Sequence, residues 1–142
     1  MLASNIIGVH HTGIAVKDIE AESKVYQNML GFEKETNILL EPPQKVYVQF
    51  LILNNYRIEL LQPVDDTSPI TNFMKKGGII NHLCYESNDI EKTVLYFRNN
   101  IKSFQTVPIT KASTLKDCYY TFFAKPSGEV IELIYFDKKY QL

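Results

Sequence analysis

The sequence predicts an α+β fold made of two tandem βαβββ modules, and two internal repeats carry this prediction. The first repeat is a His, six intervening residues and then Asp-Ile-Glu; it starts at His11 and again at His82. The second repeat is Ile-Glu-Leu, centred on Glu59 and on Glu132. Because the offsets of the two repeats nearly agree, the same succession of elements is expected in both halves of the chain.

The first half shows alternation typical of half-buried strands and one helical segment between them. Asp18 is a good N-cap for that helix, and Gly31 stands where a C-cap glycine belongs. Val46, Val48 and Phe50 alternate with other side chains in the clearest strand. The predicted strand, helix and three further strands cover residues 9–16, 19–30, 32–40, 46–52 and 56–62.

The second half repeats this succession after a polar linker that carries a short helix at residues 70–75. The expected elements are a strand at 79–87, a helix at 89–99, and strands at 104–109, 118–124 and 129–136. We expect residues 1–142 to form one domain, with module one at 7–63, the linker at 64–78 and module two at 79–136.

Strand alternation also predicts which face of each sheet carries polar side chains. Each helix must cover one face of its sheet, and Ile14 and Ile58 have the parity of helix-facing residues. The opposite parity, which we call the ligand face, carries the repeated polar residues His11, Glu59, His82 and Glu132. Two imidazoles and two carboxylates suit a divalent ion such as Zn, Ni, Co or Mn. His10 has helix-facing parity and is not expected to be a ligand.

Composition excludes several other classes of protein. The chain is 45% hydrophobic with a formal net charge of −1, which gives no basic surface for nucleic acid. It has no apolar run of the roughly 20 residues that span a membrane, and residues 1–5 do not resemble a signal peptide. Two cysteines, Cys84 and Cys118, make a disulfide framework unexpected and favour a cytoplasmic location.

Four segments together resemble the vicinal-oxygen-chelate superfamily, which includes glyoxalases, dioxygenases and antibiotic-resistance proteins. They are Val-His-His-Thr-Gly-Ile-Ala-Val at 9–16, Ile-Glu-Leu-Leu-Gln-Pro at 58–63, Asn-His-Leu-Cys-Tyr-Glu at 81–86 and Gly-Glu-Val-Ile-Glu-Leu at 128–133. The linker, with Thr-Ser-Pro-Ile at 67–70, Phe73 and Gly-Gly at 77–78, resembles the methylmalonyl-CoA epimerase branch. The resemblance covers residues 7–136.

This resemblance implies a cupped, incomplete mixed β-barrel with helices on the outside and one divalent metal. It implies that His11, Glu59, His82 and Glu132 hold that metal, and that Glu132 also moves a proton. The implied activity is that of a lyase or isomerase that removes a proton next to a metal-polarised carbonyl. The implied substrate is a thioester, a hemithioacetal or another carbonyl compound, and the implied assembly is a homodimer.

Two departures from the epimerase pattern leave the reaction open. Pro43 stands where those enzymes place a second catalytic Glu, and the nearest carboxylate is Glu41. The segment at 110–114 is Thr-Lys-Ala-Ser-Thr in place of Gly-Ala-His-Gly. Either Glu41 and Glu132 act as two bases of an epimerase, or Glu132 alone shuttles the proton as in glyoxalase. The alternative class is a non-catalytic or transferase-type antibiotic-resistance protein of the same fold.

Three further side chains are predicted to bind substrate: Tyr47, Gln49 and Tyr120. Tyr47 and Tyr120 are separated by the same offset as Glu59 and Glu132, so both are expected to line the cup. The chain contains nine tyrosines, so ordinary packing is the alternative role for either of them.

Overall fold

The structure is a computed structural model that describes residues 4–137, and these residues divide into two compact units. The first unit spans His11–Asn81. The second unit combines the described residues up to His10 with those from His82 onward. Strand β1 (Ile6–Ala15) therefore contributes its first half to one unit and its second half to the other.

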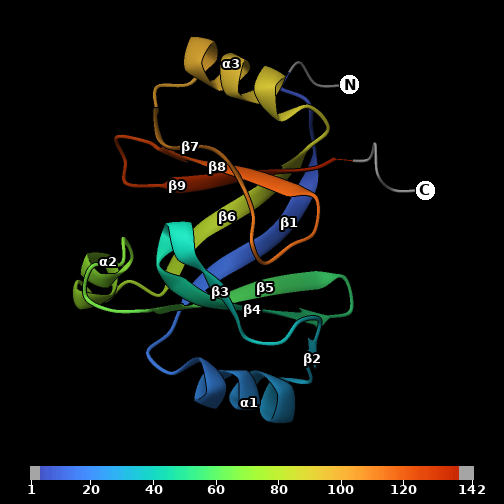
Figure 1. The fold of residues 1–142 in the computed structure, drawn as a ribbon, viewed down its shortest axis with the longest axis vertical. Coiled ribbons are helices and arrows are strands. Elements are labelled where there is room, and N and C mark those ends of the chain that lie inside the picture. The colour runs from blue at the N-terminus through green and yellow to red at the C-terminus, as the bar shows by residue number, and fades with distance from the viewer. Residues whose placement is uncertain (1–3, 138–142) are drawn as a thin grey trace. The chain divides into compact units, whose positions relative to one another are not determined.

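The first unit is a small mixed sheet with one long helix. Its remaining elements are α1 (Ile19–Leu30), β2 (Glu33–Lys34), β3 (Leu39–Glu41), a 3-10 turn at Pro42–Gln44, β4 (Val46–Leu53), β5 (Tyr56–Pro63) and α2 (Thr71–Lys75). The strand order is β2-β4-β5-β1, and β3 also pairs with β4. β1 runs parallel to β5, whereas β4 and β5 form an antiparallel hairpin (Figure 1).

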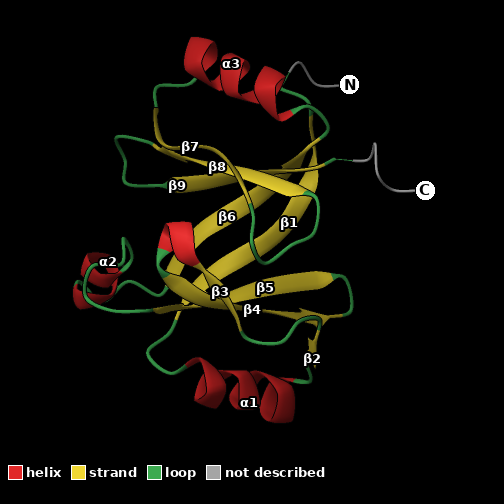
Figure 2. Ribbon diagram, in the orientation of Figure 1, coloured by secondary structure: helices red, strands yellow, loops and turns green. Residues whose placement is uncertain are grey.

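The second unit repeats this plan. It contains β6 (Ile80–Ser87) from His82 onward, α3 (Ile90–Asn100), β7 (Phe104–Lys111), β8 (Cys118–Ala124) and β9 (Val130–Phe136). The order is β6-β9-β8-β7, with β6 parallel to β9 and the other pairs antiparallel (Figure 2). The α+β class is confirmed, with the βαβββ succession in the second half and the same succession in the first half except that one predicted strand forms the two short strands β2 and β3. None of the helices in residues 4–137 is both long and apolar enough to cross a membrane.

Each long helix covers one face of its own sheet, as strand parity predicted. α1 packs through Ile19 onto a cluster that includes Leu51 and Leu60. α3 packs through Val94 and Phe97 onto a cluster with Phe123 and Leu133. These clusters bury the helix-facing residues, so the alternate side chains of the same strands point to the ligand face.

Both long helices begin at an aspartate. The Asp18 side chain accepts a hydrogen bond from the Ala21 N–H at 3.1 Å, and Asp89 does the same for Lys92. Asp18→Ala should therefore lower the free energy of unfolding by about 1 kcal/mol, the usual cost of losing an N-cap. Chemical denaturation measures this, and Asp18→Asn is the matched control because it keeps the acceptor. Equal losses in both variants would contradict the capping role.

The single strand predicted at residues 32–40 is wrong, because the segment forms two short strands separated by a gap. The gap lies where the backbone N–H groups of Glu35 and Thr36 both donate to the Phe50 carbonyl. The Thr36 hydroxyl also accepts from the Phe50 N–H at 3.0 Å. The Phe50 N–H thus bonds to a side-chain hydroxyl instead of to a backbone carbonyl of the neighbouring strand, and the strand is interrupted there.

Candidate metal centre

In the first unit, a histidine and a glutamate meet on the ligand face. His11 lies on β1 and Glu59 on β5, where Glu59 is the parallel partner of Gly13 and shares its face. The His11 Nε2 and Glu59 Oε1 atoms are 3.4 Å apart, and both residues are buried. Phe50 lies directly opposite Glu59 in the β4–β5 hairpin. Its ring and the His11 ring form a T-shaped contact with 5.2 Å between their centroids.

The second unit builds the same pair from its own strands. His82 lies on β6 and Glu132 on β9, and their Nε2 and Oε1 atoms are also 3.4 Å apart. Both residues are buried, and Phe122 lies opposite Glu132 in the β8–β9 hairpin. The Phe122 and His82 rings form a T-shaped contact with 5.3 Å between their centroids. The two units therefore hold the same constellation at equivalent places in their sheets.

The donor set of each pair fits a divalent metal. Ligand atoms about 2.1 Å from one ion, at angles between octahedral and tetrahedral values, lie about 3.0–3.4 Å apart. The separation of 3.4 Å within each pair falls in that range. An imidazole and a carboxylate buried together also suit ions such as zinc, nickel, cobalt and manganese. Each unit thus supplies one nitrogen and one oxygen donor for a metal.

Comparison with known proteins identifies the family. The model of the Glyoxalase/Bleomycin resistance protein/Dioxygenase superfamily matches residues 10–122. The chain belongs to this superfamily. The resemblance found in the sequence is thereby confirmed.

Curated relatives within the superfamily are named as epimerases. An ethylmalonyl-CoA/methylmalonyl-CoA epimerase of Cereibacter sphaeroides is 44% identical over 84 residues, which are 58% of this chain and 62% of that protein. The mitochondrial methylmalonyl-CoA epimerase of Bos taurus is 37% identical over 93 residues, which are 64% of this chain and 53% of that protein. The chain therefore spans between half and two thirds of the length of these two relatives.

Solved structures share the superfamily fold over nearly the whole chain. The crystal structure of methylmalonyl-CoA epimerase from Mycobacterium tuberculosis has a TM-score of 0.85 at 22% identity, and it covers 98% of this chain and 94% of that one. A Streptomyces coelicolor methylmalonyl-CoA epimerase variant in complex with 2-nitronate-propionyl-CoA has a TM-score of 0.80 at 21% identity, with 92% and 94% coverage. These likenesses establish the fold.

Glu41, the predicted second base, lies on the ligand face of the first unit. It pairs with Val46 across β3 and β4, and paired residues project to the same side. Val46 shares that side with Phe50 and hence with Glu59. Glu41 is also buried, with 5% of its surface exposed. Parity and burial are thus compatible with a catalytic role, which stays a prediction.

Tyr120 lies on the ligand face of the second unit, as predicted. It is buried and pairs with Ile134, which shares the face of Glu132. Its ring packs against Phe122 at a centroid distance of 5.9 Å. Tyr120 is therefore close to the ring that contacts His82.

Tyr47 and Gln49 lie on the other face of their sheet, which corrects the expectation that Tyr47 lines the cup. Gln49 is opposite Leu60, a residue of the cluster under α1, and Tyr47 has the same parity. The hairpins explain the error: Phe50 precedes Glu59 by nine residues, whereas Phe122 precedes Glu132 by ten. The structural equivalent of Tyr47 is consequently residue 119. Whether Tyr47 or Gln49 binds substrate remains a prediction.

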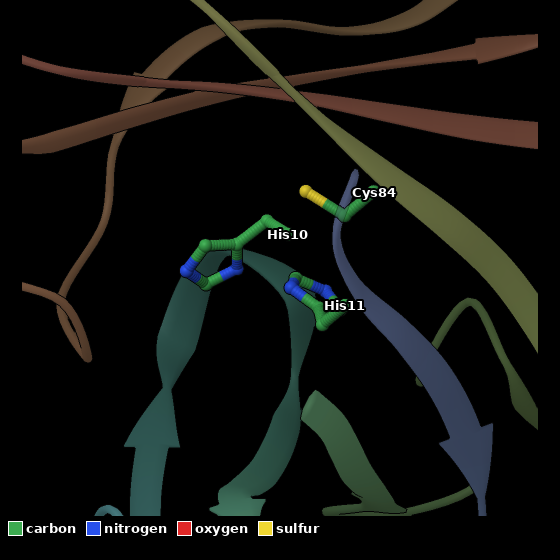
Figure 3. Close-up of side chains that lie close together, drawn as sticks. All are labelled: His10, His11 and Cys84. Carbon is green, nitrogen blue, oxygen red and sulfur yellow. The ribbon is translucent and has the colours of Figure 1, made fainter. Parts of the chain in front are cut away.

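His10 also differs from expectation. Its ring lies 5.6 Å from that of Phe136, and Figure 3 shows its side chain close to Cys84. Cys84 and Phe136 belong to the cluster under the ligand face of the second unit, not to the cluster under α3. The boundary between the units lies between His10 and His11, so His10 belongs to the second unit and His11 to the first.

Sequence reasoning missed the two phenylalanines that contact the ligand histidines. The offset from Phe50 to Phe122 falls between the offsets of the two sequence repeats. Each phenylalanine stands opposite a repeated Glu in a hairpin. An alignment of the two halves that allowed one extra residue in the second hairpin would have found them.

Proposed function

We propose that this chain is a metal-dependent epimerase of a malonyl-type acyl-CoA thioester. The observation that carries the proposal is the pair of equivalent His–Glu sites, with 3.4 Å between donor atoms in each. The names of the curated relatives support the choice of reaction and substrate class. The buried Glu41 carboxylate on the ligand face supplies a second acid–base group.

In this proposal His11, Glu59, His82 and Glu132 would be the ligands of one divalent ion. When bound, the ion acts as a Lewis acid that polarises the thioester carbonyl and makes the adjacent C–H more acidic. Glu132 accepts the proton from one side of the α-carbon. Glu41 returns a proton to the opposite side, which inverts the configuration. Burial of both carboxylates limits the access of bulk water to the α-carbon during each proton transfer, and the two carboxylates would exchange their protons with solvent between turnovers.

A lactoylglutathione lyase-type reaction is the second candidate, and Pro43 is the observation that favours it. This residue is exposed in the 3-10 turn and carries no titratable group. If Glu41 does not reach the substrate, Glu132 alone must move the proton between neighbouring carbons. A hemithioacetal would then be the substrate in place of an acyl-CoA.

Deuterium exchange tests the proposal directly. The metal-loaded protein is incubated in deuterium oxide with methylmalonyl-CoA, with a hemithioacetal and with fosfomycin in separate reactions. We expect deuterium at the α-carbon of the acyl-CoA together with loss of its optical purity. Turnover of only the hemithioacetal would favour the lyase, and modification of fosfomycin would favour the transferase class. A genuine substrate that turns over with no exchange and no primary isotope effect at that carbon would exclude proton abstraction.

We also propose a homodimer in the cytoplasm, where thiols such as Cys84 and Cys118 stay reduced. The second unit exposes large apolar side chains on its strands: Ile7, Val9, Leu83 and Phe104. Light scattering should give about twice the chain mass of 16.4 kDa at micromolar concentration. Val9→Lys should weaken the dimer, whereas Leu95→Lys on the exposed side of α3 should not. A monomeric mass for the unaltered chain would contradict the dimer without bearing on the metal site.

A further inference from the structure

A cleft lies in the first unit, away from the ligand face. It is a cleft of about 450 Å³ lined by Lys17, Asp18, Ile19, Glu20, Ile38, Tyr47 and Gln62. Tyr47 and Gln62 face each other across β4 and β5 on the side that α1 covers. This volume is within the range of small-molecule sites.

The chemistry of the cleft comes from its side chains rather than from the start of α1. The Ile19 N–H donates to the Gln62 Oε1, and the Ala21 N–H donates to Asp18, so these helix amides are already used. The Gln62 amide NH2, the Tyr47 hydroxyl and the Lys17 ammonium have no partner among residues 4–137. Ile38 adds an apolar surface to the cleft.

The mixture of charges decides what kind of ligand fits. One ammonium and two carboxylates line the cleft, so a phosphate group placed inside the cleft would meet net repulsion, and the part of a ligand that enters it should be uncharged. A neutral heteroaromatic base with an exocyclic amine matches better. Its amine can donate to Glu20 or Asp18, its ring nitrogens can accept from Gln62, and its plane can stack on Tyr47.

We propose that this cleft binds the adenine base of the acyl-CoA substrate. The identity of the ligand rests on the proposed function, because an acyl-CoA carries an adenine nucleotide. Tyr47 supplies the stacking surface, Gln62 and Glu20 read the edge of the base, and Lys17 meets a phosphate at the rim. Tyr47 and Gln62 are paired across the β4–β5 hairpin, next to its terminal pair, Val46 and Pro63. The flexible arm of the thioester would pass around this end of the sheet to the ligand face.

Binding of nucleotide fragments tests the site without any catalysis. Amide NMR signals of residues 17–20 and of Tyr47 are followed during titration with adenosine monophosphate, inosine monophosphate and ribose phosphate. We expect adenosine monophosphate to shift these signals at the lowest concentration. Inosine monophosphate, which lacks the exocyclic amine, should bind about tenfold more weakly, and ribose phosphate should leave the signals unmoved. Equal binding of ribose phosphate, or no shift with adenosine monophosphate, would overturn the proposal.

Kinetics with two matched substrates tests the same site during turnover. Tyr47→Leu should raise KM for the CoA thioester about tenfold, the usual effect of losing one stacked base, and leave kcat unchanged. The same variant should leave KM unchanged for the pantetheine thioester, which has no nucleotide. Gln62→Glu keeps the acceptor for Ile19 and removes the amide donor, so it should also raise KM only for the CoA thioester. Equal changes for both substrates would contradict an adenine site.

Tyr56→Leu serves as the control, because Tyr56 is an exposed tyrosine of the same unit that does not line the cleft. Thermal denaturation of Tyr47→Leu confirms that the variant is folded. Adenosine monophosphate binding by a chain that epimerises no acyl-CoA would refute the proposed function and preserve the adenine site. Epimerase activity with equal KM values for Tyr47→Leu and the unaltered chain would support the proposed function and refute the adenine site.

Discussion

His82→Ala is expected to abolish stoichiometric metal binding and, with it, turnover. His82 is 4% exposed and lies 3.4 Å from the Glu132 oxygen, so its loss removes one donor of the proposed four. Altering a residue that only hydrogen-bonds to a metal ligand typically weakens metal affinity by about 10–100-fold. Removing a ligand should cost more than that, and activity should fall to the background rate. Metal analysis of the purified protein after equilibration with zinc, cobalt, nickel or manganese measures the first effect.

Two control variants accompany His82→Ala: one tests whether the packing around residue 82 is kept, and the other removes a histidine that is not a proposed ligand. His82→Leu fills more of the space beside Phe122 than alanine does and carries no donor atom, so it separates loss of a ligand from loss of packing. His10→Ala removes the neighbouring imidazole that contacts Phe136, and it should keep full metal content. Because the two units hold equivalent pairs, His11→Ala should behave like His82→Ala. Stoichiometric metal in His82→Ala would refute the four-ligand site.

Glu41→Gln is expected to cut turnover of the acyl-CoA by about 10²–10⁴-fold, the range for a lost acid–base group. Metal content should stay unchanged, because Glu41 is not among the proposed ligands. Val46, opposite Glu41, and Phe50, opposite Glu59, are four positions apart along β4. With two strand spacings across the sheet, the Cα atoms of Glu41 and Glu59 lie about 16 Å apart by ideal sheet dimensions. The proposed acyl group would occupy the space between the metal and Glu41.

Two further variants sharpen this test. Glu33→Gln, an exposed residue on β2 of the same unit, should leave turnover unchanged. Pro43→Glu in the Glu41→Gln background should not restore activity, because residue 43 is exposed in the turn rather than on the ligand face. A silent Glu41→Gln in an active epimerase would exclude Glu41 as a base and favour a single carboxylate, Glu132.

The sequence by itself determined which residues form the two His–Glu pairs. Alternation along a strand has a period of two, so His11 and Glu59 had to share the face opposite Ile58, and the structure agrees. The helix bounds were equally predictable, because Asp18 and Gly31 cap α1 through local contacts. Repeated spacing then predicted the second pair from the first. Local rules of this kind need no knowledge of which strands pair.

Tertiary structure alone decided the features that depend on register and on partners. One extra residue in the second hairpin shifts the equivalence of β4 and β8, which moved Tyr47 off the ligand face. The Thr36 hydroxyl takes a ladder hydrogen bond from Phe50 and divides a predicted strand in two. His10 lies beside Cys84 and Phe136 of the second unit, a placement that strand parity did not predict. Side-chain parity is local to one strand, whereas the face it points to is fixed by the pairing of that strand with others.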